Sequence, residues 1–289
     1  MSEPGARWTY AEFDDRASRL ATALDRAGVG AGDTVACYLY NGSAYLETVF
    51  AAFKLGAVPV NANYRYTSAE LTSLLDDAGA AAIVFSGSLA PNVAHAAAHL
   101  PSLRLLVRDG DAPGADPGPD AADLSAIRRT TPPRPHSPRP GSDRLFMYTG
   151  GTTGRPKGVV WRQSDLLHGI AVAVFGPLGR DAPPEGLDDA VALAVSARAE
   201  DRSPVTLPVV PLMHGTGLFN TLGALLVGGR AVFARPGRLD PPHVWQTVAA
   251  ERVQTIVVAG NAVAAPWSTS WPEPSAQAHH TTSRRCAWC

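Results

Sequence analysis

The sequence predicts an α/β fold in which layered, largely parallel sheets are flanked by helices. Short apolar stretches alternate along the chain with segments that repeat apolar residues every three or four positions, as strands and helices do. The apolar stretches show no regular polar alternation, which is typical of sheets covered on both faces. A length of 289 residues is sufficient to bury such a core in one large or two ordinary domains.

Two capping boxes predict the starts of two helices in the first third of the chain. Thr9 with Glu12, and Thr67 with Glu70, place a hydroxyl and a carboxylate where the first N–H groups of a helix need acceptors. Apolar stripes follow each box, and a further stripe between them ends near Gly56. Strands are expected between these helices and after them, at residues 34–40, 58–60, 81–85 and 103–107.

Residues 109–143 form a Pro-rich connecting loop in this interpretation. Eight of the 25 prolines fall between positions 111 and 142, with several glycines and aspartates. We therefore expect no regular structure and a mobile surface connection there. Its arginines favour a solvated loop over an anion-binding patch; they are Arg128, Arg129, Arg134 and Arg139.

The alternation resumes in the second half of the chain. Helices are expected at residues 164–175, 218–227 and 241–251, the last opened by a proline, which suits the first turn of a helix. Residues 176–204 are weakly patterned and are interpreted as an insertion. Short strands are expected just before His214 and at residues 231–233 and 254–258.

The most informative stretch is residues 145–160, which read L-F-M-Y-T-G-G-T-T-G-R-P-K-G-V-V. An apolar run leads into glycines and hydroxyls, followed by one proline and one lysine. Glycines let the backbone approach a ligand, and successive N–H groups can bind an anion. Hydroxyls and a lysine add donors and charge. The candidate polyphosphate-binding residues are Thr149, Gly150, Gly151, Thr152, Thr153, Gly154 and Lys157.

Two common phosphate loops are excluded by spacing. The P-loop of NTPases needs Gly-Lys-[Ser/Thr] in succession, whereas two residues separate Gly154 from Lys157. The dinucleotide fingerprint needs G-x-G-x-x-G, which Gly150, Gly151 and Gly154 do not provide.

The stretch resembles the signature loop of adenylate-forming (AMP-binding) enzymes of the acyl-CoA synthetase and luciferase-like superfamily. Their pattern is close to Y-T-S-G-T-T-G-x-P-K-G, and this chain departs from it only at Gly150, where a serine is usual. The runs W-T-Y-A-E-F-D-D and F-K-L-G-A-V-P-V-N-A-N-Y-R-Y also resemble the N-terminal part of acyl-CoA synthetases. The resemblance covers residues 7–265 and implies a partial N-terminal AMP-binding domain.

The resemblance also assigns roles to individual residues. Pro211 to His214, read as P-L-M-H, resembles a segment whose histidine lies beside the acyl end of the family's active site. Lys157 is the catalytic candidate, because the family's lysine adds a charge-assisted bond to the phosphates. Lys54 is expected to be a helix-face charge. The polar run after the second strand is expected to be structural, although it could approach the site; it comprises Asn61, Asn63, Tyr64 and Arg65.

The implied chemistry is ATP-dependent activation of a carboxylic acid to an acyl-adenylate and then to acyl-CoA. The resemblance implies ATP, Mg²⁺ and coenzyme A as cofactors. The apolar character of residues 212–227 favours a fatty or other hydrophobic acid. Two alternatives remain open at this point: a non-catalytic module that binds a nucleotide or an acyl chain, and an unrelated phosphotransferase.

Residues 266–289 look unlike the rest. They hold three of the six tryptophans and two of the three cysteines without helical or strand periodicity. Our hypothesis is an irregular tail that is out of frame or artificially ended. We expect no metal site, because the spacing of His279, His280, Cys286 and Cys289 is poor for zinc. The adenine, ribose and hinge segments of the family are not found, so the chain is expected to be truncated and inactive alone.

The overall charge and hydropathy of the chain argue against several other classes of protein. A formal net charge of −1 argues against nucleic acid. No apolar run reaches the length of a membrane span. The first residues lack a signal-peptide layout, so a cytoplasmic location is expected. Oligomeric state is left open.

Overall fold

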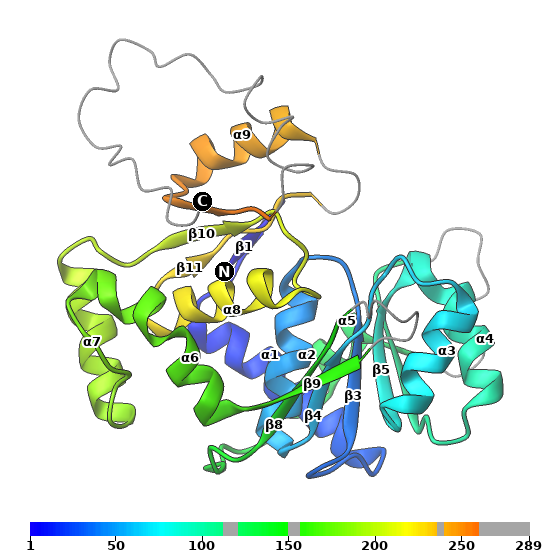
Figure 1. The fold of residues 1–289 in the computed structure, drawn as a ribbon. Coiled ribbons are helices and arrows are strands. Elements are labelled where there is room, and N and C mark those ends of the chain that lie inside the picture. The colour runs from blue at the N-terminus through cyan, green and yellow to red at the C-terminus, as the bar shows by residue number, and fades with distance from the viewer. Residues whose placement is uncertain (112–120, 150–156, 236–239, 260–289) are drawn as a thin grey trace.

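The computed structural model describes residues 1–111, 121–149, 157–235 and 240–259. Two sheets form its framework, and helices cover their faces (Figure 1). The larger sheet has seven strands in the order β7-β6-β5-β3-β4-β8-β9, and the smaller has the order β11-β10-β12. All neighbouring strands of both sheets pair in parallel except β8 and β9. The predicted fold class is confirmed.

The larger sheet is built from the strands expected in the first half of the chain and from the strands that flank the glycine-rich stretch. Because its parallel strands point the same way, their carboxyl ends meet at one edge, where ligands bind in open α/β sheets. The strands are β3 Thr34–Tyr38, β4 Val58–Asn61, β5 Ala80–Ser86, β6 Leu105–Asp109, β7 Ala122–Asp123, β8 Arg144–Thr149 and β9 Lys157–Arg162.

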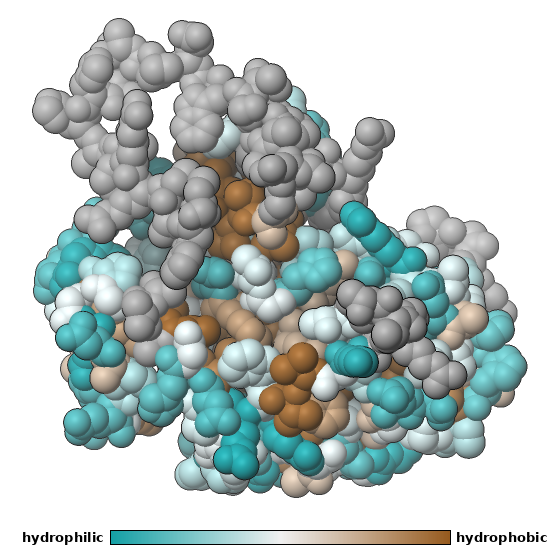
Figure 2. All heavy atoms as spheres, viewed as in Figure 1, coloured by the Kyte–Doolittle hydropathy of each residue, from teal (hydrophilic) through white to brown (hydrophobic). Residues whose placement is uncertain are grey.

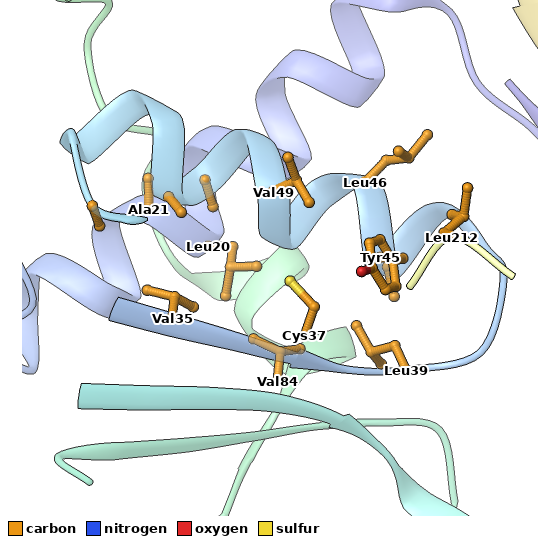
Figure 3. Packing of buried hydrophobic residues seen from close by; sticks show 14 of the residues in the cluster. Leu20, Ala21, Val35, Cys37, Leu39, Tyr45, Leu46, Val49, Val84 and Leu212 are labelled. Atoms are coloured by element: carbon orange, nitrogen blue, oxygen red, sulfur yellow. The ribbon is translucent and has the colours of Figure 1, made fainter. Parts of the chain in front are cut away.

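Helices pack on both faces of this sheet. One core cluster lies beneath α1 and α2, and a second lies beneath α3 and α4. Figure 3 shows side chains of α1 and α2, including Leu20 and Tyr45, lying over Cys37 of β3 and Leu39 just after it. The helices are α1 Tyr10–Arg26, α2 Ser43–Leu55, α3 Ser68–Asp77, α4 Ala90–His99, α5 Leu124–Thr130 and α6 Gln163–Phe175.

The smaller sheet is built from the second half of the chain. Its central strand β10 pairs in parallel with β11 and β12. A short hairpin of β1 (Ser2–Glu3) and β2 (Ala6–Arg7) joins it through a bridge between Ser2 and Val232. The elements are η2 Gly176–Leu178, α7 Leu187–Ala199, β10 Val205–Pro208, α8 Gly215–Leu226, β11 Arg230–Ala231, α9 Pro241–Glu251 and β12 Thr255–Val257.

Both predicted capping boxes are present. Thr9 accepts the N–H of Glu12, whose carboxylate accepts the N–H of Thr9, and Thr67 and Glu70 make the same reciprocal pair. Hydrogen bonds to the threonine lower the pKa of each glutamate. These helix starts are therefore determined by residues three positions apart, within reach of a sequence pattern.

The prediction for residues 109–143 is wrong in its described part. The strand β7 and the helix α5 interrupt the Pro-rich stretch. Asp123 caps α5 by accepting the N–H of Ala126, and Leu124 is fully buried. Three of the arginines form ion pairs: Arg128 with Glu47, Arg134 with Asp25 and Arg139 with Asp143. The helix forms because its apolar residues are buried against the larger sheet, and this burial outweighs the effect of the many prolines around it.

Two other helices were not predicted. The helix α7 lies inside the supposed insertion at residues 176–204, and α4 follows β5 by way of a short turn, η1 Gly87–Leu89. Half of α4 is alanine, so few large apolar side chains mark its period, whereas α7 carries apolar residues on two faces and shows no single stripe with a polar remainder. The strand β9 is also unlike a core strand, because Val159 and Val160 are exposed.

A buried ion pair network joins three helices to the sheet. Glu47 of α2 is fully buried and accepts hydrogen bonds from Arg16 of α1 and Arg128 of α5. Arg128 also lies 3.4 Å from Asp109 at the end of β6. Burial raises the pKa of Asp109, and the Arg128 charge opposes that rise.

None of the helices in the described part of the chain is both long and apolar enough to cross a membrane.

Arg128→Met should lower the free energy of unfolding by about 3 kcal/mol, because removing one partner leaves the buried Glu47 carboxylate undercompensated. The matched control is Arg129→Met, since Arg129 is an exposed neighbour on the same helix. Urea denaturation of both variants measures the difference. Equal stabilities would show that the network contributes nothing specific.

Candidate active site

The base of the predicted phosphate loop lies at the carboxyl end of β8. The strand β9 returns antiparallel to β8, and Thr149 stands directly opposite Lys157 in the register. Both side chains are exposed. The intervening candidates lie outside the described residues; they are Gly150, Gly151, Thr152, Thr153 and Gly154. What the structure defines is therefore a hydroxyl and a cation on paired positions at the loop base.

Asn61 connects this loop base to the segment that carries His214. Its side chain is buried at the carboxyl end of β4, next to β8 in the sheet. The carboxamide nitrogen donates to the carbonyl of Tyr148 at 2.9 Å and to that of Met213 at 2.6 Å. Its oxygen accepts the N–H of Tyr148. One side chain thus holds two segments that are remote in sequence.

A second asparagine fixes the other end of the His214 segment. Asn41 follows β3 and donates to the carbonyls of Pro208 and Val210, at 3.0 and 3.2 Å. Its oxygen accepts the N–H of Leu212 at 2.7 Å. Pro208 ends β10, and Val210 and Leu212 lie just beyond it, so the carboxamide continues the backbone hydrogen bonding past the end of the strand. Asn41 thereby anchors the smaller sheet to the larger one.

His214 occupies the N-cap position of α8. The helix begins close to the preceding turn: a Cβ at Gly217 would lie 2.5 Å from the carbonyl oxygen of Pro211. Only glycine permits this approach, so the start of α8 is placed firmly against residues 210–211. That packing positions His214 at the mouth of a cavity rather than on the outer surface.

A cavity of about 400 Å³ lies between the larger sheet and the start of α8, and both Thr149 and His214 line it. Asn61 and Asn63 add further polar groups to its wall. The opposite part is apolar, where the rings of Trp161 and Phe219 meet edge to face at 5.5 Å. Figure 2 shows hydrophobic residues gathered along the middle of this face, with mostly hydrophilic residues outside. The cavity can hold a molecule with one polar and one apolar end.

A larger hollow of about 570 Å³ lies at the carboxyl ends of β3, β5 and β6. Three carboxylates line it, from Glu3, Asp109 and Asp111, and its Arg128 is already paired with Glu47. Such a lining repels a polyphosphate. The smaller cavity lies beside Lys157, and the described residues of its wall include no carboxylate, so it is the better candidate.

His214 has a basic neighbour. Part of His214 is open to solvent, but part of it is buried. This partial burial lowers the pKa of the imidazole below the ordinary 6.5, and the positive charge of Arg65 lowers the pKa further. The imidazole is therefore neutral at pH 7. A neutral ring can accept or donate a hydrogen bond without adding a charge beside an apolar substrate.

The structure brings together some predicted residues and adds others. Thr149 and His214 meet in one cavity, and Lys157 stands beside Thr149 but outside the cavity wall. Lys54 pairs with Asp14 on the helix surface, as expected. The positioning roles of Asn41 and Asn61 were missed. The available signal for Asn61 was a polar residue that ends a fully apolar buried strand.

A largely parallel sheet flanked by helices, with a cavity at the carboxyl ends of its strands, is typical of α/β enzymes. Over residues 1–285 the sequence matches the AMP-binding enzyme family. The chain belongs to this family, and the expected resemblance is confirmed.

The relatives are bacterial CoA ligases. The chain is 34% identical over 282 residues to the medium-chain acyl-CoA ligase Mig of Mycobacterium avium, covering 90% of this chain and 49% of that protein. It is 32% identical over 265 residues to a medium/long-chain-fatty-acid–CoA/3-oxocholest-4-en-26-oate–CoA ligase of Mycolicibacterium smegmatis, covering 91% and 46%. The chain spans about half the length of these curated relatives.

Solved structures agree on the fold. A fatty acyl CoA synthetase from Mycobacterium tuberculosis is 25% identical with a TM-score of 0.58, covering 87% of this chain and 44% of that one. A benzoate CoA ligase from Burkholderia xenovorans LB400 has a TM-score of 0.67 at 21% identity, covering 88% and 45%. At that identity the second likeness concerns the fold alone.

Asn61→Ala should destabilise the protein by about 2–4 kcal/mol, because it leaves buried carbonyl and N–H groups without partners. Asn63→Ala is the matched control, since Asn63 is only partly buried and its oxygen accepts the N–H of Arg65 within its own loop. Asn63→Ala should lower the free energy of unfolding by less than about 1 kcal/mol. Thermal and urea unfolding of the pair measure both effects, and similar losses for the two variants would contradict the bridging role.

The pKa of His214 should be found below 6.5 in the folded protein. Because the folded state then binds this proton more weakly than the unfolded chain, protonation of His214 opposes folding as the pH falls through this range. Arg65→Gln should raise the pKa of His214 only in part, because burial is the larger cause. An NMR titration of the imidazole checks both statements. An unshifted pKa in the parent protein would refute them.

Proposed function

We propose that this chain supplies the phosphate-binding and acyl-binding part of an ATP-dependent acyl-CoA synthetase acting on a fatty or other hydrophobic carboxylic acid. A carboxylate is a poor electrophile, so the acid first attacks the α-phosphate of ATP and gives an acyl-adenylate and pyrophosphate. The thiol of coenzyme A then displaces AMP. Mg²⁺ would neutralise charge on the phosphates.

The residues described here suit the first of these steps. The Thr149 hydroxyl and the Lys157 ammonium would bind the β- and γ-phosphates at the loop base and stabilise charge on the leaving pyrophosphate. Gly150, Gly151, Thr152, Thr153 and Gly154 would contribute N–H groups and hydroxyls. His214, held at the cavity mouth, would border the acid, and the Trp161 and Phe219 rings would contact its apolar part.

The observation that carries this proposal is the Asn61 bridge. It brings the end of β8 and the His214 segment into one cavity. Holding the reacting groups of two substrates in a fixed relation is the main requirement for an in-line displacement. The names of the mycobacterial relatives favour a medium- or long-chain fatty acid or a steroid side-chain acid as the substrate.

Lys157→Ala should weaken ATP binding to the chain about ten- to a hundredfold, the loss expected for one charge-assisted bond of about 1.5–3 kcal/mol. Lys54→Ala is the matched control, because Lys54 is the chain's other lysine and pairs with Asp14 away from the cavity. Isothermal titration calorimetry with ATP and Mg²⁺ measures binding. Acid-dependent ATP–pyrophosphate exchange, with fatty acids of increasing length, measures the first step in a version of the protein completed to the full length of its relatives.

The outcomes separate the alternatives. Exchange that requires a hydrophobic acid supports the synthetase. Saturable ATP binding without exchange favours a non-catalytic nucleotide-binding module instead. Equal affinity of the parent and Lys157→Ala proteins would remove the phosphate-binding assignment, and exchange that needs no acid would point to an unrelated phosphotransferase.

A further inference from the structure

The helix α7 has two apolar faces, and only one is covered. On its inner side Leu193 and Ala197 pack in a small cluster with Phe175, Leu178 and Val227. On its outer side Leu187, Val191 and Val195 are 76%, 52% and 63% exposed. These three recur every four residues, so they form one stripe along the helix. Figure 1 shows α7 at the left edge of the molecule, away from the larger sheet.

Opposite charges flank the stripe at its two ends. Asp188 lies in the first turn of α7 and Arg198 in the last. At 100° per residue both fall on the stripe's side of the helix. Both are exposed, and neither forms an ion pair within the part of the chain that the structure describes. The neighbouring Asp189, in contrast, is paired with Arg180.

This arrangement is complementary to itself. If a second α7 is laid antiparallel across the stripe, with a two-fold axis near position 193, Val191 meets the partner's Val195 and Leu187 meets the partner's Ala199. The same register places Asp188 opposite the partner's Arg198, and the axis repeats each contact. Apolar contacts and two ion pairs then coincide in a single register.

We propose that the outer face of α7 is a homodimer interface in which two copies of this chain pair through antiparallel α7 helices. The proposal is independent of the enzymatic activity suggested above. An anionic membrane suits the face poorly, because Asp188, Glu200 and Asp201 leave its border without an excess of positive charge. A single helix pair buries less than a standard interface, so a dissociation constant on the order of 10–100 µM is expected.

Sedimentation velocity, measured over a series of protein concentrations that spans this dissociation constant, tests whether the two copies pair. Asp188→Arg places an arginine opposite the Arg198 of the other copy in both symmetry-related contacts. The variant should therefore associate at least about tenfold more weakly than the parent. The double variant Asp188→Arg with Arg198→Asp restores both ion pairs with reversed polarity and should recover association to within about threefold of the parent. The double variant also opposes the helix dipole at both termini, so its recovery cannot come from a more stable helix.

A second pair of variants tests the apolar stripe. Val195→Lys should abolish association, whereas Ser196→Lys, on the neighbouring exposed position facing away from the stripe, should leave it unchanged. Circular dichroism confirms that each variant remains folded. A parent protein that is monomeric throughout the series would overturn the proposal. It would equally be overturned if the charge swap failed to restore association, or if Val195→Lys and Ser196→Lys behaved alike.

Discussion

The hydrogen bonds of the Asn61 carboxamide are the interaction on which the candidate site depends. They join the strand that enters the glycine-rich loop to the turn that carries His214. Asn41 links the larger sheet to the residues just before this turn, whereas Asn61 bonds directly to both segments. Because the groups involved are buried backbone N–H and C=O, their pairing is obligatory, and the relative position of the two segments follows from it.

Local rules predicted much of the fold. The helices after Thr9 and Thr67 were predictable because each capping box is completed by a glutamate three positions on. The parallel strands were predictable because their residues are apolar on both faces. Thr149 and His214, which the resemblance to a family assigned to one active site, line the same cavity. Their roles stay predictions, and the residues alone gave no signal that they lie close together.

The failures have a common physical origin in contacts between remote positions. Arg128 was interpreted as a solvated loop residue, yet its partner Glu47 lies in a different helix and is fully buried. Asn41 reaches residues of the other sheet, at Pro208 and Leu212. No spacing within the sequence encodes such pairs. The helices α4 and α7 were missed for other reasons: half of α4 is alanine, which marks no period, and α7 is apolar on two faces rather than on one.

The position of β9 at the end of the larger sheet has a consequence for the protein's behaviour in concentrated solution. In the described part of the structure it is a terminal strand, and Val159 and Val160 are exposed on it. Such an edge is a template for intermolecular β-sheet aggregation. Cations bracket it, however, with Lys157 and Arg162 at its ends and Arg144 opposite Arg162. These charges repel an identical edge, so high ionic strength, which screens them, should promote aggregation.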